Sequence, residues 1–451
     1  PPKAPKPPKA PKPAKEPKPA KERTPHEGEW KPGSAIVVII GVLVIALIIG
    51  MLAWLIINAQ AMRPNPSPTP SESATKVIVK QVDPLVTAAD LGNIGGEEWV
   101  KISGTPSEEA AYCIGKALLA DTARELAGVR LDQADEGPDT MVNLVATFPQ
   151  ADGATNMYRL LEQQFGLCYS SGMQIIDSIA IAGLADEAYA MTLLAAGSPK
   201  SYHTLVTVLS GKRVFIFDVT AATDAVGVKD VAVPIVRVLE RLCRDSQGSC
   251  PTKLQYHDVV SPATEAVGYL SEADLPLVNP GTGQWKASAP TADLAFPGTN
   301  CEQGLDQVDA EKGRRTLILE GDARSAGIFG VDQLNFIFDD DAKATELYDK
   351  LALDITECQT RLPTASYEDT GVIPAEGKAD PVGAWGQTYR AQTWAVTQAS
   401  GNGGEQRYRV GAVIAGPRVA YVFANPSAGF DFTDKEWLAV VRKAGERLTQ
   451  A

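Results

Sequence analysis

The side chains that could do chemistry are few in this chain of 451 residues, and they stand apart from one another. Its three histidines are His26, His203 and His257, too few for a multi-histidine metal site. His203 follows Tyr202 in a strand-like run, and an isolated histidine is more often a surface or structurally satisfied residue than a catalyst. We therefore expect neither a catalytic histidine nor a metal site.

Two acidic clusters are further candidates. Asp339 to Asp341 could suggest calcium, but the run lacks the alternating spacing and the distal glutamate of an EF-hand. The run is better interpreted as the start of a helix, because carboxylates there stabilise the positive end of the helix dipole and its free N–H groups. Asp186-Glu187 would suit acid–base chemistry, but we align Gly386-Gln387 with it in the internal repeat described below. We assign the acidic pair no catalytic role.

Sequence motifs for catalysis are absent as well. The chain has no G-x-S-x-G elbow, H-E-x-x-H, Walker loop, paired C-x-x-C or kinase catalytic signature. The glycine-rich run from Gly401 to Gly404 lies between two strand-like segments and indicates a flexible loop rather than a phosphate cradle. We predict a protein that is not an enzyme, with no catalytic residues, no cofactor and no metal. The sequence does not identify ligand-binding residues.

The distribution of charge along the chain limits the classes of partner that it can bind. The first 31 residues carry nine Lys/Arg and four Asp/Glu, a net charge of +5. Subtraction from the totals of 42 and 55 leaves 33 basic and 51 acidic residues, a net charge of -18 for the rest. Binding to nucleic-acid phosphates needs clustered Lys/Arg, so we expect no nucleic-acid partner.

The N-terminal region predicts a membrane protein. Residues 1–34 are rich in Pro and Lys and predict a disordered, extended tail, either a spacer near anionic lipid or a docking arm for a partner. Residues 35–57 carry no charge, and 23 residues at about 1.5 Å each can cross a bilayer. Because nine Lys/Arg precede this run, the tail should be cytoplasmic and the rest extracytoplasmic. A cleaved signal peptide ending near Ala59-Gln60-Ala61 is the alternative.

From Arg63 to Ser73 prolines alternate with small polar residues, and we predict that residues 58–82 form a stalk between the bilayer and a folded body. The body contains an internal duplication. Leu85 to Leu91 matches Tyr269 to Leu275, and each match is followed by a tryptophan and then a cysteine. Both copies end in Glu-Arg-Leu, at Glu240 and Glu446. We predict domains at 83–250 and 265–451, joined by a linker at 251–264.

Each copy mixes strands with helices. Apolar residues recur at spacings of 4, 3 and 4 in both copies, as on one face of an amphipathic helix: Ala154, Tyr158, Leu161 and Phe165, then Ala344, Tyr348, Leu351 and Ile355. Strand-like runs flank Ser210 to Lys212 and the matching turn at Gly416, which predicts a hairpin in each copy. The fold class is therefore α+β: one transmembrane helix, then two duplicated domains, each an antiparallel sheet with packed helices and a disulfide.

Six cysteines outside the membrane favour disulfides. Cys113 and Cys168 occupy the same repeat positions as Cys301 and Cys358, so the duplication predicts one bond within each copy. The remaining pair, Cys243 with Cys250, would join the end of the first domain to the linker.

These features resemble the PknH-like extracellular sensor domain. The resemblance rests on the Ala-Asp-Leu motif, Cys113, the strand end Phe148-Pro149-Gln150-Ala151-Asp152 with its following helix, and Cys168. That domain forms the outer part of some actinobacterial receptor Ser/Thr kinases and of other envelope proteins. It implies an α+β domain with a cleft that senses an envelope ligand. The second copy departs from the pattern at Phe338 to Ala342, so the first is the better candidate for binding.

The function expected from the sequence is thus a non-catalytic, single-pass sensor or ligand-binding protein of the cell envelope. Its partners would be the lipid bilayer and an envelope ligand or protein. A structural or partner-binding envelope protein is the alternative. Because no initiator methionine precedes Pro1, a further alternative is the sensor half of a receptor Ser/Thr kinase.

Overall fold

The computed structural model describes residues 83–451 with internal gaps. The gaps are 93, 95–97, 104–110, 115–122, 135–138, 167–172, 196–198, 263–265, 278–282, 295–297, 323–328, 377–387, 400–402 and 427–428. The predicted tail, membrane span and stalk lie outside the described residues. Among the helices that are described, none is long and apolar enough to cross a membrane.

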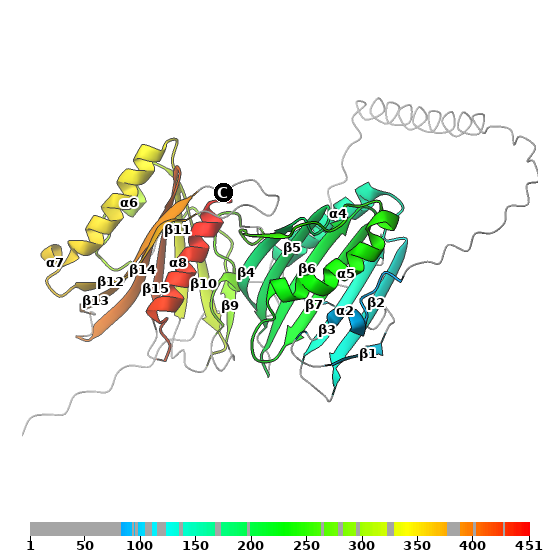
Figure 1. The fold of residues 1–451 in the computed structure, drawn as a ribbon. Coiled ribbons are helices and arrows are strands. Elements are labelled where there is room, and N and C mark those ends of the chain that lie inside the picture. The colour runs from blue at the N-terminus through cyan, green and yellow to red at the C-terminus, as the bar shows by residue number, and fades with distance from the viewer. Residues whose placement is uncertain are drawn as a thin grey trace, which may run out of the picture. The chain divides into compact units, whose positions relative to one another are not determined.

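The first repeat is built on an eight-stranded antiparallel sheet with the order β1-β2-β3-β7-β6-β5-β4-β8 (Figure 1). Its strands are β1 (Trp99–Ser103), β2 (Glu125–Gln133), β3 (Thr140–Thr147), β4 (Met173–Ala182), β5 (Glu187–Ala195), β6 (Ser201–Ser210), β7 (Arg213–Ala221) and β8 (Gln255–Asp258). Strand β8 lies within the predicted linker and pairs with β4. Part of the linker therefore extends the first sheet.

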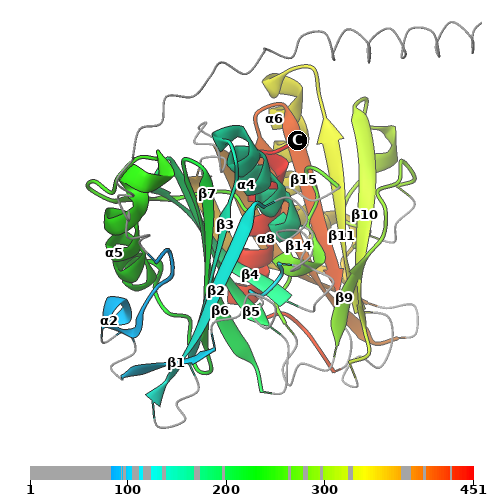
Figure 2. The ribbon, with the colours of Figure 1, turned by 90° about the vertical axis from the view of Figure 1, so that its right-hand side faces the viewer.

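Helices cover both faces of this sheet. Helix α4 (Ala151–Gly166) packs on one face, while α5 (Val228–Ser246) and the short α2 (Ala88–Leu91) pack on the other (Figure 2). Each face has its own apolar core, because strand side chains alternate between the two faces. Leu205 and Ile216 belong to the core on the α4 side, whereas Val206 and Phe217 belong to the core on the α5 side.

The second repeat has a seven-stranded antiparallel sheet with the order β12-β13-β14-β15-β11-β10-β9. Its strands are β9 (Gln284–Ala287), β10 (Glu311–Glu320), β11 (Phe329–Ile337), β12 (Ser366–Glu376), β13 (Tyr389–Ala399), β14 (Glu405–Ala415) and β15 (Arg418–Asn425). Helix α6 (Asp341–Thr356) and the short α7 (Cys358–Arg361) lie on one side, and α8 (Asp434–Leu448) lies on the other. Two 3₁₀ turns, η4 (Glu272–Asp274) and η5 (Leu305–Gln307), complete the repeat.

The β6–β7 and β14–β15 hairpins have matching registers. Thr204 pairs with Val219 in the β6–β7 hairpin, and Arg409 pairs with Ala424 in the β14–β15 hairpin. Both members of the pair are displaced by the same number of residues, since 409 − 204 and 424 − 219 both equal 205. The two turn glycines, Gly211 and Gly416, have the same φ of 54°. The structure thus confirms a mixed α+β fold with two antiparallel sheets, and each sheet contains one of the matching hairpins.

The predicted helix stripe is also confirmed in both copies. All eight of its residues are buried: Ala154, Tyr158, Leu161, Phe165, Ala344, Tyr348, Leu351 and Ile355. At the start of α6, the Asp340 side chain accepts a hydrogen bond from the backbone N–H of Lys343 at 2.9 Å. The acidic run therefore caps a helix, as the sequence indicates.

The repeated Ala-Asp-Leu and Glu-Arg-Leu motifs meet in space. In the first repeat, Arg241 of α5 makes a bidentate ion pair with Asp90 of α2, at 2.5 and 3.0 Å. In the second, Arg447 of α8 makes the same pair with Asp274 of η4, at 2.9 Å for both bonds. Each pair ties the last helix of a repeat to its first segment, which explains why both motifs occur twice.

Disulfides link two of the predicted cysteine pairs. Cys301 is bonded to Cys358, and Cys243 is bonded to Cys250. Cys113 is also disulfide-bonded, whereas Cys168 lies outside the described residues. The Cys113–Cys168 bond stays a prediction.

Candidate functional site

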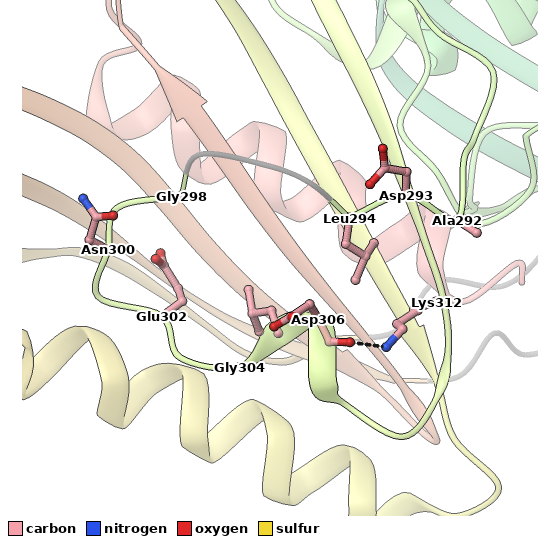
Figure 3. Close-up of a pocket in the computed structure, with 10 residues that line it drawn as sticks. Ala292, Asp293, Leu294, Gly298, Asn300, Glu302, Gly304, Asp306 and Lys312 are labelled. Atoms are coloured by element: carbon pink, nitrogen blue, oxygen red, sulfur yellow. Dashed lines mark hydrogen bonds between the residues drawn. The ribbon is translucent and has the colours of Figure 1, made fainter.

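A described pocket lies in the second repeat, beside the Cys301 loop (Figure 3). It has a volume of about 560 Å³, within the range of small-molecule sites. Its described lining residues are Ala292, Asp293, Leu294, Gly298, Asn300, Glu302, Gly304, Leu305, Asp306 and Lys312. Asn300 and Glu302 lie on one side of the hollow, and Asp293 and Leu294 lie on the other (Figure 3). The sequence favoured the first repeat for binding, but this pocket belongs to the second.

Glu302 is the best-fixed polar group of the pocket. One of its carboxylate oxygens accepts the backbone N–H of Thr299 at 3.0 Å, and the Thr299 hydroxyl lies 2.9 Å from both oxygens. The Tyr421 hydroxyl of β15 donates to the same carboxylate. Burial raises the pKa of Glu302 above its usual value, although the hydrogen bonds from Thr299 act in the opposite direction. The carboxyl group is thus held in one orientation at the pocket wall.

The loop that carries Glu302 is anchored from three directions. The Cys301–Cys358 disulfide joins it to the start of α7. Arg361 of α7 donates to the Cys301 carbonyl at 2.9 Å, and Asp354 of α6 accepts the backbone N–H of Gln303 at 3.1 Å. A pocket wall built in this way is preformed, which lowers the entropic cost of ligand binding.

The charges of the lining are mostly negative. Asp293, Glu302 and Asp306 contribute carboxyl groups, and Lys312 is the one basic residue among the described lining. The Lys312 ammonium donates to the backbone carbonyls of Asp306 and Val308 at 2.6 and 3.0 Å. Its hydrogen bonds therefore fix the η5 segment, as Figure 3 shows for Asp306. Among the charged side chains of the described lining, carboxyl groups therefore outnumber basic groups.

The equivalent loop of the first repeat, around Cys113, is held by a hydrogen bond to a buried aspartate. The backbone N–H of Tyr112 donates to Asp218 of β7 at 2.6 Å. The other oxygen of Asp218 lies 2.9 Å from Nδ1 of His203, and Nε2 of that ring lies 3.2 Å from the Ser201 hydroxyl. The Tyr112 ring stacks on the imidazole at 4.2 Å between centroids. Serine, histidine and aspartate thus form one hydrogen-bonded chain.

Strand geometry places these residues together. Ser201 and His203 are two residues apart on β6 and therefore lie on the same face of the sheet. Asp218 lies diagonally across the hairpin, because His203 pairs with Thr220 in the ladder. His203 and Asp218 are buried, whereas Ser201 is half-buried at the beginning of the strand.

The second repeat has other residues at these positions. With the register displacement of 205, Gln406, Tyr408 and Phe423 replace Ser201, His203 and Asp218. Tyr408 and Phe423 stack at 5.3 Å between centroids, and Gln406 bonds to Asn425 at 2.9 Å. A polar chain in one copy is thus an aromatic pair in the other.

The remaining candidates from the sequence are dispersed. His257 is exposed on β8, and His26 lies outside the described residues. Asp186 accepts the backbone N–H groups of Gly211 and Ser249 at 2.6 and 2.8 Å, so it fixes the hairpin turn. Burial acts to raise its pKa, but these bonds and the one from the Ser249 hydroxyl hold the pKa below its usual value. The described residues contain no group of side chains suited to a metal ion.

Sequence reasoning missed both the Glu302 pocket and the contacts of His203. The histidine is not isolated, because the hairpin brings Asp218 to its ring. A signal existed: the turn at Gly211-Lys212 fixes the hairpin register, and Ser201-x-His203 has the two-residue period of one strand face. No comparable sequence pattern pointed to Glu302, since the residues around it belong to α6, α7 and β15.

Comparison with known proteins gives a weak likeness of fold. No family model and no curated protein matches the chain. The chain is similar to the solved extracellular domain of PknH from Mycobacterium tuberculosis, at 12% identity over 34% of this chain and 92% of that one, with a TM-score of 0.28. It is also similar to the immunity protein TplEi from Pseudomonas aeruginosa, at 12% identity over 69% and 90%, with a TM-score of 0.18.

Proposed function

We propose that this protein is a membrane-anchored, extracytoplasmic sensor or ligand-binding protein, and that its second repeat binds a small molecule without catalysis. The supporting observation is the preformed pocket of about 560 Å³ with the carboxyl group of Glu302 at its wall. Disulfide, helix and strand contacts all hold that wall in place. Such rigidity suits recognition of one ligand shape.

The residue types of the pocket support binding of a polar ligand. The ten described lining residues include no serine, cysteine or histidine, and three of them carry carboxyl groups. The carboxyl groups of Asp293, Glu302 and Asp306 match a ligand rich in hydroxyl or amino donors. Sugars and amino sugars, such as those of cell-wall glycans, have this chemistry.

The membrane location in this proposal rests on the sequence. The uncharged run at 35–57 and the nine Lys/Arg before it support a single-pass anchor with a cytoplasmic N-terminus. Disulfides also suit an oxidising compartment outside the cytoplasm. Protease added to intact cells should remove the two repeats and spare the tail; protection of the C-terminus would refute this topology.

The alternative is a structural or partner-binding envelope protein, which would need a large exposed apolar patch. The exposed large apolar residues of the described chain are spread over β1, β4, α5, α6, β12 and a loop. Only β12 has two, Tyr367 and Val372. This distribution gives the partner-binding function less support than the pocket gives to ligand binding.

A thermal-shift panel tests the proposal on the full chain in detergent. The probes are glucosamine, N-acetylglucosamine and soluble peptidoglycan fragments. We expect at least one probe to raise the melting temperature of the wild type and to have no effect on Glu302→Gln. The matched control is Glu311→Gln, which removes an exposed carboxylate from β10 in the same repeat. No shift with any probe, together with a stable protein partner in pull-downs, would favour the alternative.

A further inference from the structure

We propose that Ser201 of the first repeat is an activated nucleophile that accepts an acyl group from a small carboxylic ester, with His203 as its general base and Asp218 as the residue that positions the base. This activity is separate from ligand binding in the second repeat. It follows from the hydrogen-bonded chain Ser201–His203–Asp218.

The hydrogen bonds among Ser201, His203 and Asp218 run in the direction that proton transfer from the serine requires. A carboxylate can only accept, so the proton of the imidazole lies on Nδ1, which faces Asp218 at 2.9 Å. Nε2 is then an acceptor and faces the Ser201 hydroxyl at 3.2 Å. This distance is at the long end of the range for a serine–base contact in a protein without substrate. The Ser201 hydroxyl therefore lies beside a ring nitrogen that can accept its proton.

The base is also held rigidly. Asp218 accepts the Tyr112 backbone N–H at 2.6 Å through its second oxygen, so the carboxylate cannot rotate without losing a bond. The Tyr112 ring covers one face of the imidazole at 4.2 Å, and the Thr220 hydroxyl lies 3.3 Å from Nδ1. A buried aspartate that orients a histidine is one part of the arrangement used in serine acyl transfer.

The three residues differ in solvent exposure: the nucleophile is more exposed than the base and the aspartate. Asp218 and His203 are 3% and 7% exposed, whereas Ser201 is half-buried at the end of the sheet. The proposal requires an ester to approach the Ser201 hydroxyl while the two supporting residues stay out of water. The second repeat has Gln406, Tyr408 and Phe423 at these positions and provides an internal negative control.

The reaction balances with the groups present. The Ser201 oxygen attacks the ester carbonyl carbon, and its proton passes to Nε2 of His203. The C–O bond to the alcohol then breaks, and the protonated imidazole gives its proton to the leaving alkoxide. The products are an acyl-serine and a free alcohol. Water attacks the acyl-serine in the same way and releases a carboxylic acid.

A fluorophosphonate probe tests the assignment, because it forms a phosphorus–oxygen bond with an activated serine and releases fluoride. The full chain is treated with the probe, digested and analysed by mass spectrometry. We expect modification of the Ser201 peptide and no modification of that peptide in Ser201→Ala. Modification should be undiminished in the control Ser366→Ala, which removes an exposed serine at the beginning of β12 in the second repeat. The His203→Gln variant should react at least about 100-fold more slowly, since it lacks the base.

Folding is checked by circular dichroism and melting, because His203 and Asp218 are buried. The His203→Gln and Asp218→Asn variants must retain the wild-type melting curve to within a few degrees before their rates are compared. Hydrolysis of p-nitrophenyl acetate provides a second readout and should be lost in Ser201→Ala. Three results would each overturn the proposal. The first is equal labelling of wild type and Ser201→Ala, and the second is labelling unaffected by His203→Gln in the folded protein. The third is no labelling of the native wild type.

Discussion

The two repeats share a scaffold but differ in the places where chemistry is possible. Their hairpins have the same register, their helices bury the same stripe, and each closes with an Arg–Asp ion pair. At one set of equivalent positions, however, the first repeat has Ser201, His203 and Asp218, and the second has Gln406, Tyr408 and Phe423. The pocket with Glu302 belongs to the second repeat. The comparison shows that a duplicated framework can keep its structural contacts while its candidate sites diverge.

The shared ion pair itself differs between the repeats in burial. The Arg447 and Asp274 side chains are 2% and 0% exposed, while Arg241 and Asp90 are 35% and 9% exposed. Arg447 also donates to the carbonyls of Ser261 and Pro262, at 3.0 and 2.7 Å. Replacing one partner of a fully buried pair leaves the other charge without compensation, so the two pairs should respond very differently to the same mutation.

Arg447→Ala should therefore have the largest effect on stability, a loss of about 3–5 kcal/mol in the free energy of unfolding. The matched change Arg241→Ala should cost about 1 kcal/mol, because water screens the more exposed pair. Chemical denaturation of the two variants measures the difference. Equal losses would show that burial does not separate the two pairs.

The disulfides give the next comparison. Cys301 and Cys358 are 57 residues apart in sequence, and Cys243 and Cys250 are 7 apart. On the chain-entropy model, removal of the first bond by paired Cys→Ala changes should cost about 4 kcal/mol, and removal of the second about 2.5 kcal/mol. Melting and denaturation of the two double variants check the order. A larger loss for the Cys243–Cys250 variant would contradict it.

Buried amides should have smaller and similar effects in the two repeats. Asn143 of β3 accepts the backbone N–H of Val86 at 3.0 Å, and Gln333 of β11 accepts that of Leu270 at 2.7 Å. Asn143→Ala and Gln333→Ala each leave a buried backbone donor unpaired, at a cost of about 1–3 kcal/mol. Losses that differ by more than this range would mean that the two contacts are not equivalent.

The pH dependence of stability tests the same buried ion pair in another way. Burial acts to raise the pKa of Asp274, but Arg447 outweighs it and holds the pKa below its usual value. A lowered pKa stabilises the folded state above the unfolded pKa of about 3.9, and that stabilisation is lost as pH falls through the lower, folded value. The free energy of unfolding should thus decrease below about pH 4. The decrease should be weaker in Asp274→Asn, and an equally steep decrease would contradict the assignment.

Much of the scaffold was predictable from the sequence because it depends on local periodicity. The stripe through Tyr158 and Tyr348 defines a helix in each repeat, and the turns at Gly211 and Gly416 define two hairpins. Strands such as β4, β8 and β12 were not predicted. Strand β8 has four residues, and the burial along β12 does not alternate, so neither has a clear two-residue pattern.

The candidate sites were harder to predict because they depend on contacts between distant segments. The Glu302 carboxylate meets Tyr421, which is 119 residues further along the chain. The Tyr112 amide reaches Asp218 across 106 residues. No local pattern encodes such contacts. Only the pairing of His203 with Asp218, 15 residues apart across one hairpin, was within reach of sequence reasoning.

The most direct test of ligand binding in the second repeat is isothermal titration calorimetry on three forms of the full chain: wild type, Glu302→Gln and Ser201→Ala. The titrants are glucosamine and a soluble peptidoglycan fragment. The account predicts that wild type and Ser201→Ala bind the same titrant with equal affinity, and that Glu302→Gln binds it at least about tenfold more weakly, the effect of losing about 1.4 kcal/mol. Equal affinity in wild type and Glu302→Gln, or a loss of binding in Ser201→Ala alone, would contradict the account.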